Sequence, residues 1–497
     1  MEIGLRIERH LRIILSIILV ILPLITIYVL FHFRGPQWDL TAHSLLGKSL
    51  LNYLTHSAVG AKTAFVGEYL NNLIYYAEPY RAPLSTPIFA LLSIFFAEPV
   101  LPYMILVYLG AVAALYKLGR QTGIDTLIIF SAFLNPYVLY FFFVPNGMEG
   151  LSIIFVLLAL TLLYKKRSIS GVFLAMASLA KYPALILLPL VLLLGTKKKI
   201  ISGLIFEVAT ISPWLLFNYF VYGNPLYGYE AALSNAVTSG GYTIVHPFAV
   251  LAVIGYPLAL CLIGIAAWVS KKKNKAMPHF RNKYKVFAVF FALSLIGYAF
   301  VLPHNDFFTQ ERFGYLFSTA FIIISASFLT DVLPKKLHIE RYIAVAAIMV
   351  LVVGLYYTYI TSSTSVVEYY NSNSPNNVYT QAYSELSLLG FGGCRFISNA
   401  WIPMLYQHMN AYSPFIRYSS KTITPIVIRL LAHHGINYTE FTEEQARYPI
   451  VVIEGAGVSP SLIIGLKNST LSYNTSYIQI YLPKNVTCYA PTLYPAG

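Results

Sequence analysis

Residues 168–193 read SISGVFLAMASLAKYPALILLPLVLL, and this apolar stretch decides the fold. The basic run KKR precedes it and the run KKK follows it. Such runs mark the cytoplasmic ends of membrane segments. Both ends therefore belong on one side, and at about 1.5 Å per residue each half is too short for about 30 Å of hydrocarbon. The pattern predicts a broken, re-entrant hairpin with Lys181 at its apex, lining a buried or watery cavity.

The rest of the chain is similarly apolar. Of its 497 residues, 57% are hydrophobic and only 11% are charged, compared with about 25% charged residues in an ordinary globular protein. The hairpin at 168–196 accounts for two of about 11 predicted crossings, and one of the neighbouring segments 82–97 and 99–116 should dip in and return. The clearest spans are 13–31, 99–116, 124–143, 148–164, 201–221, 248–269, 286–303, 312–330 and 342–361. This pattern predicts a multi-pass α-helical membrane protein.

The positive charge of the chain reports its orientation. The net charge is +14, but most lysines and arginines lie in short loops where every second crossing should turn. This distribution follows the positive-inside rule and argues against a nucleic-acid partner. It predicts a cytoplasmic N-terminus, and an odd number of crossings places the C-terminus outside.

The composition changes after the last span. Residues 1–364 form the predicted membrane domain, and 365–497 form a small exterior α/β domain with buried strands at CRFISNA and YPIVVIE and a helix at 424–435. Two cysteines of this domain, Cys394 and Cys488, either form a disulfide or stay free. All four N-glycosylation motifs lie here, at Asn437, Asn468, Asn474 and Asn485. Their confinement to one end supports an exterior location.

The first exterior loop, 32–81, contains the stretch GPQWDLTAHSLLGKSLL. Its leucines recur at near-helical spacing, with Thr41, His43, Ser44 and Lys48 on other faces. This predicts an amphipathic helix in the membrane interface. Asp39 stands at its head, where it suits two roles: an N-cap or a working carboxylate.

Several other polar residues belong to the predicted exterior side. A charged lysine at position 181, within an apolar segment, is energetically unfavourable unless it contacts water or an anion. Lys181 should therefore either snorkel to the surface or contact a phosphate. Arg312 either pairs with Glu311 and anchors to headgroups, or binds a lipid phosphate through its planar fork. Arg81 is a weaker candidate for the same role, and His304 lies in the same loop as Glu311.

Five stretches of the chain resemble the GT-C superfamily of membrane glycosyltransferases, in the branch of protein O-mannosyltransferases and the aminoarabinose transferase of lipid A. They are GPQWDLTAHSLLGKSLL, RAPLSTPIFALLSIFF, ASLAKYPALILLPLVLLL, SPWLLFNYFVYGNPL and QERFGYLFSTAFIII. The most specific is the third, a small-residue half helix followed by lysine and a leucine-rich half. The resemblance covers residues 10 to about 360.

This resemblance implies a hexosyltransferase that takes a sugar such as mannose from polyprenyl or dolichyl phosphate. Asp39 would be the catalytic base, and Lys181, Arg312, Arg81, His304 and Glu311 would bind the phosphate and sugar. The acceptor would be a protein, lipid or glycan hydroxyl. Many relatives carry Asp-Glu where this chain has Asp39-Leu40. No cofactor is expected, and a divalent metal remains an option that no motif indicates.

Two other classes of function stay open from the residues alone. A flippase or transporter of lipid-linked sugars would place ionisable groups near the bilayer midplane in paired broken helices, whereas the hairpin break has no evident partner. A surface receptor would leave the many spans unexplained. The exterior glycosylation motifs, with the high isoleucine and tyrosine content, favour an archaeal plasma membrane.

Overall fold

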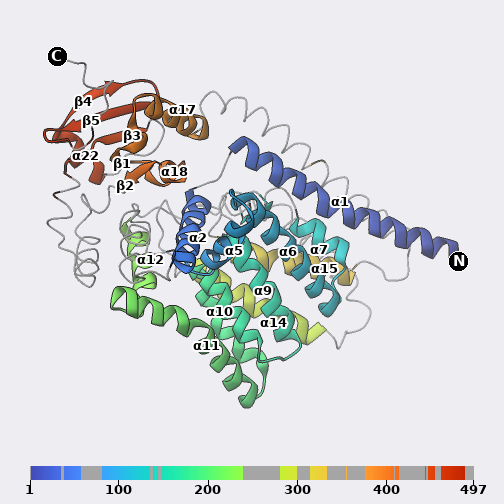
Figure 1. Cartoon of the computed structure of the whole chain (residues 1–497). Coiled ribbons are helices and arrows are strands. Elements are labelled where there is room, and N and C mark those ends of the chain that lie inside the picture. Colours follow the sequence, from blue (N-terminus) through green and yellow to red (C-terminus); the bar gives the residue numbers. More distant parts are fainter. Residues whose placement is uncertain are drawn as a thin grey trace.

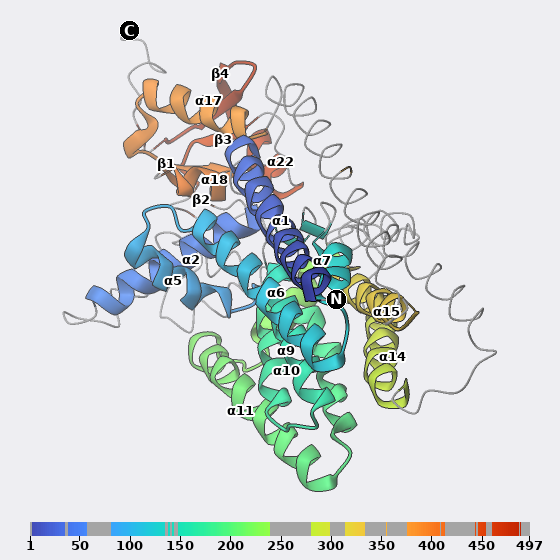
Figure 2. The same cartoon turned by 90° about the vertical axis from the view of Figure 1, so that its right-hand side faces the viewer.

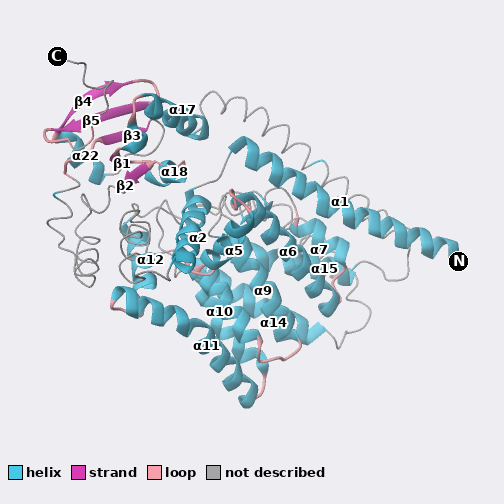
Figure 3. Ribbon diagram, in the orientation of Figure 1, coloured by secondary structure: helices cyan, strands magenta, loops and turns pink. Residues whose placement is uncertain are grey.

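The protein is mostly helical, with a small β-sheet near its C-terminus (Figures 1 and 3). The computed structural model describes residues 2–34, 38–56, 81–134, 138–139, 142–143, 148–238, 280–298, 314–332, 354, 375–407, 409–412, 443, 446–453, 460–486 and 488. The predicted spans 248–269 and 342–361 lie almost entirely outside these residues, as does the helix predicted at 424–435.

The helices of the N-terminal part follow the predicted apolar segments. They are α1 (Glu2–Arg34), α6 (Val100–Thr122), α7 (Thr126–Phe133), α9 (Met148–Tyr164), α11 (Lys197–Tyr222), α14 (Phe280–Ile296) and α15 (Tyr315–Val332). Among the described residues, two helices are long and apolar enough to cross a membrane, at Val100–Thr122 and Lys197–Phe220. The apolar stretches of the other helices are shorter, including Ile13–Val29 within α1.

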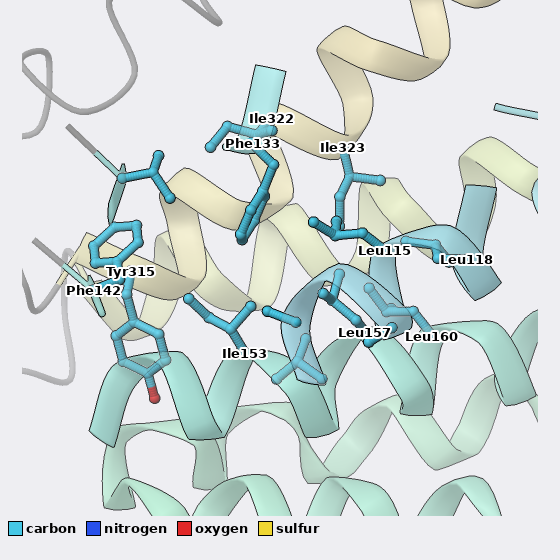
Figure 4. Packing of buried hydrophobic residues seen from close by; sticks show 14 of the residues in the cluster. Leu115, Leu118, Phe133, Phe142, Ile153, Leu157, Leu160, Tyr315, Ile322 and Ile323 are labelled. Carbon is cyan, nitrogen blue, oxygen red and sulfur yellow. The ribbon is translucent and has the colours of Figure 1, made fainter. Parts of the chain in front are cut away.

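The core of this part is built from aliphatic and aromatic side chains, with α6, α7, α9 and α15 among the helices that supply them (Figure 4). Leu115 on α6, Leu157 on α9 and Ile323 on α15 are fully buried there. A turn fixes how α6 leads into α7: the Asp125 side chain accepts a hydrogen bond from the Leu127 amide at 2.9 Å. This is the favoured way to begin a helix.

The stretch 168–196 is a broken hairpin. Its first half is the α-helix α10 (Ser170–Ala180) and its second half is the 3₁₀ helix η1 (Tyr182–Leu194), while Lys181 between them has an extended backbone. The two flanks lie together, because Lys166 Nζ bonds to the carbonyl of Leu193 and Ser168 Oγ bonds to that of Lys199 at 3.0 Å. The return predicted from the charges is therefore observed.

Two short helices, α2 (Trp38–His56) and α5 (Ser85–Phe95), pack along each other. They approach so closely that a Cβ on Gly47 of α2 would lie 2.4 Å from Phe89 Cβ of α5. Segment 82–97 is thus an 11-residue helix on α2, and α6 is the long helix that follows it. Of the two segments, only the second forms a helix that is long and apolar enough to cross a membrane.

The predicted amphipathic character of α2 was wrong over its first half. Thr41, His43 and Ser44 were expected on exposed polar faces, but all three are buried together with Leu40 and Leu46. They are buried because protein covers α2 on two sides: α5 on one and the C-terminal domain on the other.

The C-terminal domain contains a five-stranded mixed sheet. Its strands are β1 (Arg395–Ser398), β2 (Asn410–Tyr412), β3 (Ile450–Ile453), β4 (Ser469–Asn474) and β5 (Ile478–Pro483), in the order β2-β1-β3-β5-β4. The strands β2, β1 and β3 are parallel, and β5 and β4 run antiparallel to their neighbours. The helices are α17 (Pro375–Leu388), α18 (Trp401–Tyr406) and α22 (Pro460–Lys467). Both predicted strands are present as β1 and β3.

Cys394 and Cys488 form a disulfide, with their Cα atoms 5.5 Å apart. It joins the residue before β1 to a residue beyond β5, and so links the chain before the first strand to the chain after the last one. Asn468, Asn474 and Asn485 have exposed side chains, as glycan attachment would require. Asn437 lies outside the described residues.

The C-terminal domain rests on α2, and both views place it beside this helix (Figures 1 and 2). Ala42 and Leu46 of α2 belong to the same buried cluster as Trp401 and Met404 of α18. At the edge of this contact Lys48 Nζ lies 5.4 Å from the centre of the Tyr406 ring. The Tyr406 hydroxyl also bonds to Glu98, between α5 and α6. The domain therefore helps to fix α2.

The close approach of α2 and α5 predicts the effect of a single methyl group. Gly47→Ala should lower the free energy of unfolding by about 1–3 kcal/mol, because overpacking forces the two helices apart. Thermal unfolding of the purified protein in detergent measures this. The matched control is Gly393→Ala, where no atom lies within 4 Å of an added Cβ. Equal melting temperatures for the two variants would contradict the packing.

Candidate functional site

Four segments that are far apart in sequence meet at one place. They are the first turns of α2 and α9, the residues that lead into α5, and the break between α10 and η1. Each brings charged or polar side chains, and together they form a polar cluster within otherwise apolar helices.

The carboxylate of Asp39 is paired with Arg81. Arg81 Nη1 lies 2.9 Å from Asp39 Oδ1, and the side chains are 6% and 21% exposed, respectively. The helix α2 begins at Trp38, so Asp39 lies in its first turn rather than before it. An acidic residue is favoured there by the helix dipole. The N-cap interpretation is therefore replaced by an ion pair in which Asp39 keeps part of its surface accessible.

Lys181 is paired as well. Its Nζ lies 2.7 Å from Oε1 of Glu149, whose side chain is fully buried in the first turn of α9. No described residue makes a hydrogen bond of standard geometry to either Glu149 oxygen, so the ion pair with Lys181 compensates its charge. Lys181 itself is only 16% exposed. Of the two alternatives for Lys181, snorkelling to the surface is not what the structure shows, because a buried partner holds the side chain inside, and the phosphate contact stays a prediction.

The two ion pairs are joined through the backbone of the hairpin apex. The hydroxyl of Tyr182 donates a hydrogen bond to the carbonyl of Arg81 at 3.2 Å. Immediately beside it, the amide of Leu84 donates to the carbonyl of Leu179 at 3.0 Å. These bonds fix the break of the hairpin against the segment that carries Arg81.

His43 lies one turn after Asp39 on α2 and contacts Ser85. Its Nδ1 lies 2.7 Å from Ser85 Oγ. Burial lowers the pKa of His43 well below its usual value of 6.5, and the nearby charges of Arg81 and Lys181 add to the effect while Asp39 opposes it. His43 is therefore neutral at pH 7 and acts as a fixed hydrogen-bonding group.

The structure unites three of the predicted site residues and says nothing of three others. Asp39, Arg81 and Lys181 come together, whereas His304, Glu311 and Arg312 lie outside the described residues. Within the described part of the chain, no group of three or more His, Cys, Asp and Glu side chains is arranged to hold a metal ion.

Glu149 was missed as a member of this cluster. Its signal in the sequence is an acidic residue at the head of a long apolar run, MEGLSIIFVLLALTLLY. A carboxylate there requires a buried partner or a functional reason, and Lys181 was the lysine in need of one. Sequence spacing alone does not pair them, because the contact depends on how α9 and α10 pack.

No known protein family matches this chain, and comparison with curated proteins also gives no match. Its function is therefore inferred from the residues of the site.

The buried state of His43 predicts a pH dependence of stability. The unfolded chain binds a proton on this residue below about pH 6.5, whereas the folded protein resists it, so stability falls as the pH drops below that value. The slope is at most about 1.4 kcal/mol per pH unit. Unfolding of the purified protein between pH 7.5 and 5 should show this loss, and His43→Gln should remove it. An unchanged slope in the variant would show that His43 titrates normally.

The ion pair of Glu149 and Lys181 predicts that a single variant loses more stability than the double variant does. Glu149→Gln should lower the free energy of unfolding by about 3–5 kcal/mol, because it leaves the lysine ammonium without its compensating charge. The double variant Glu149→Gln, Lys181→Met should recover most of that loss. A double-mutant cycle by thermal or denaturant unfolding measures the coupling. Simply additive losses would mean that the two groups do not interact.

Proposed function

We propose that the protein is an integral membrane glycosyltransferase. It would move a sugar, a hexose such as mannose, from a polyprenyl or dolichyl phosphate to an acceptor hydroxyl. The observation that carries this proposal is the position of Asp39, whose partly exposed carboxylate is paired with Arg81. The carbonyl of Arg81 accepts a hydrogen bond from Tyr182, at the hairpin apex that bears Lys181. One general base and two cations within a membrane-embedded fold are the groups that such a reaction needs.

The proposed arrangement in the membrane follows the charged loops. The flanks of the hairpin, with Lys166 and Lys199, would face the cytoplasm together with the N-terminus. The site would then lie at the opposite, exterior face, and so would the C-terminal domain. The cell membrane is the proposed location, with about 11 crossings in all. The two long apolar helices α6 and α11 support this placement.

The proposed reaction is a direct displacement. The acceptor oxygen attacks the anomeric carbon while Asp39 takes the hydroxyl proton, which is general base catalysis. The bond between the anomeric carbon and the phosphate oxygen breaks, and the lipid phosphate leaves with the electron pair. Attack from the face opposite the leaving group inverts the configuration of the sugar.

The cations would stabilise the leaving phosphate. Each is paired with a carboxylate in the structure, so binding of the donor exchanges one anion for another at Arg81 or Lys181. A guanidinium binds phosphate oxygens in the same forked geometry as a carboxylate. When the phosphate takes over Arg81, the carboxylate of Asp39 is released to accept a proton. Donor binding would thus activate the base.

Asp39→Asn tests the proposal. The amide keeps the size of the side chain and accepts no proton, so transfer should fall by about 10²-fold or more. The assay supplies purified full-length protein with dolichyl phosphate carrying radiolabelled mannose or glucose and a crude acceptor pool, and counts label in the product. Asp125→Asn is the matched control, because Asp125 caps α7 and asparagine caps equally well.

Two results would contradict the proposal. Full transfer by Asp39→Asn would remove the base from the mechanism. Movement of labelled lipid across vesicles without any transfer, by wild type and variant alike, would identify a flippase of lipid-linked sugars instead.

A further inference from the structure

A cluster of aromatic and amide side chains adjoins the polar site. Tyr182 follows Lys181 at the hairpin apex, Trp214 and Asn218 lie near the end of α11, and Tyr229 lies in α12 (Tyr227–Thr238). The rings of Tyr182 and Tyr229 are 4.6 Å apart and inclined at 46°. Because the Tyr182 hydroxyl also bonds to the Arg81 carbonyl, this cluster is continuous with the site.

The elements of the cluster are held close together. A Cβ on Gly228 would lie 2.9 Å from the Tyr182 hydroxyl and 3.0 Å from Cζ2 of Trp214. Asn218 Nδ2 donates a hydrogen bond to the carbonyl of Pro225 at 3.2 Å. Glycine at 228 is therefore needed for α12 to approach α11 and the hairpin, and the side chains around it are fixed.

Several polar atoms of this cluster are buried without a hydrogen bond. The carbonyl oxygen of the Asn218 side chain and the hydroxyl of Tyr229 have no hydrogen-bond partner in the described residues. Trp214 Nε1 is near the Tyr182 hydroxyl but completes no hydrogen bond of good geometry with it. Buried polar atoms are nearly always satisfied in native proteins. Three unsatisfied atoms in one place indicate that a polar ligand completes them.

The chemistry of the cluster defines that ligand. Trp214 supplies a donor, Asn218 an acceptor, and Tyr229 a hydroxyl that can do either. Burial raises the pKa of Tyr229 to about 12, so this hydroxyl keeps its proton at neutral pH. Together with Tyr182, these side chains carry no charge. An uncharged cluster suits a neutral ligand with several hydroxyls better than a phosphate. The aromatic rings offer apolar faces of the kind on which a sugar ring packs.

We propose that Trp214, Asn218, Tyr229 and Tyr182 form the subsite for the sugar ring of the lipid-linked donor. The inference rests on the proposed transfer function and deepens it. Lys181, the proposed phosphate contact, is the neighbour of Tyr182 in the chain. Tyr182 also bonds to the carbonyl of Arg81, the other proposed phosphate contact. A phosphate held by Lys181 and Arg81 would carry its sugar beside this cluster, and the subsite would select the donor by its sugar.

The test compares binding of three lipids to the purified full-length protein: dolichyl phosphate, dolichyl phosphate mannose and dolichyl phosphate glucose. Wild type should bind at least one of the sugar-bearing lipids about tenfold more tightly than dolichyl phosphate. Tyr229→Phe and Trp214→Phe should each cut that preference about three- to tenfold, because each removes one hydrogen-bonding group. Their dissociation constants for bare dolichyl phosphate should stay unchanged.

The controls separate this subsite from general packing. Tyr219→Phe alters an exposed tyrosine of the same helix and should leave every dissociation constant unchanged. Lys181→Met should weaken all three lipids together. An undiminished sugar preference in both Tyr229→Phe and Trp214→Phe, or no preference in wild type, overturns the subsite and leaves the proposed function standing. Failure of wild type to bind any of the lipids overturns both.

Discussion

Two ion pairs among the apolar helices of the N-terminal part constrain the rest of the structure. A charged group taken out of water is costly unless a partner and hydrogen bonds compensate it. Asp39 has Arg81, and Glu149 has Lys181. Because the four residues come from α2, the approach to α5, α9 and the hairpin break, these pairings specify how those segments meet. The Tyr182 hydroxyl joins the two pairs.

The site is also supported by the C-terminal domain. The helix that carries Asp39 is clamped between α5 and α18, so its orientation depends on contacts on both sides. His43, one turn further along, is held by Ser85 at the beginning of α5. A carboxylate on a helix with this much support has little freedom to turn away from Arg81. Rigid support of this kind is what a positioned base requires.

The sequence predicted the features that depend on neighbouring residues in the chain. It did not predict the contacts that depend on residues far away in the chain. Basic runs on both sides of 168–193 predicted the hairpin, because neither half could cross the membrane. The alternation of apolar residues predicted β1 and β3. The burial of Ala42 and Leu46 against the C-terminal domain was not predictable, because the residues of that domain lie more than 300 positions later in the chain. The sequence also shows that a carboxylate at Glu149 needs a buried partner. It does not show that this partner is Lys181, because their contact depends on helix packing.

The contact between α2 and α18 also sets an order of events during synthesis. Ala42 and Leu46 leave the ribosome more than 350 residues before Trp401, which shares their buried cluster. At about 5–20 residues per second, this interval lasts roughly 20 to 70 s. During this interval the face of α2 that carries Ala42 and Leu46 is not yet packed against the C-terminal domain. Only α5, which follows soon after α2 in the chain, is already present. The packing of α2 is thus completed only after the residues of α18, far later in the chain, have been made and folded.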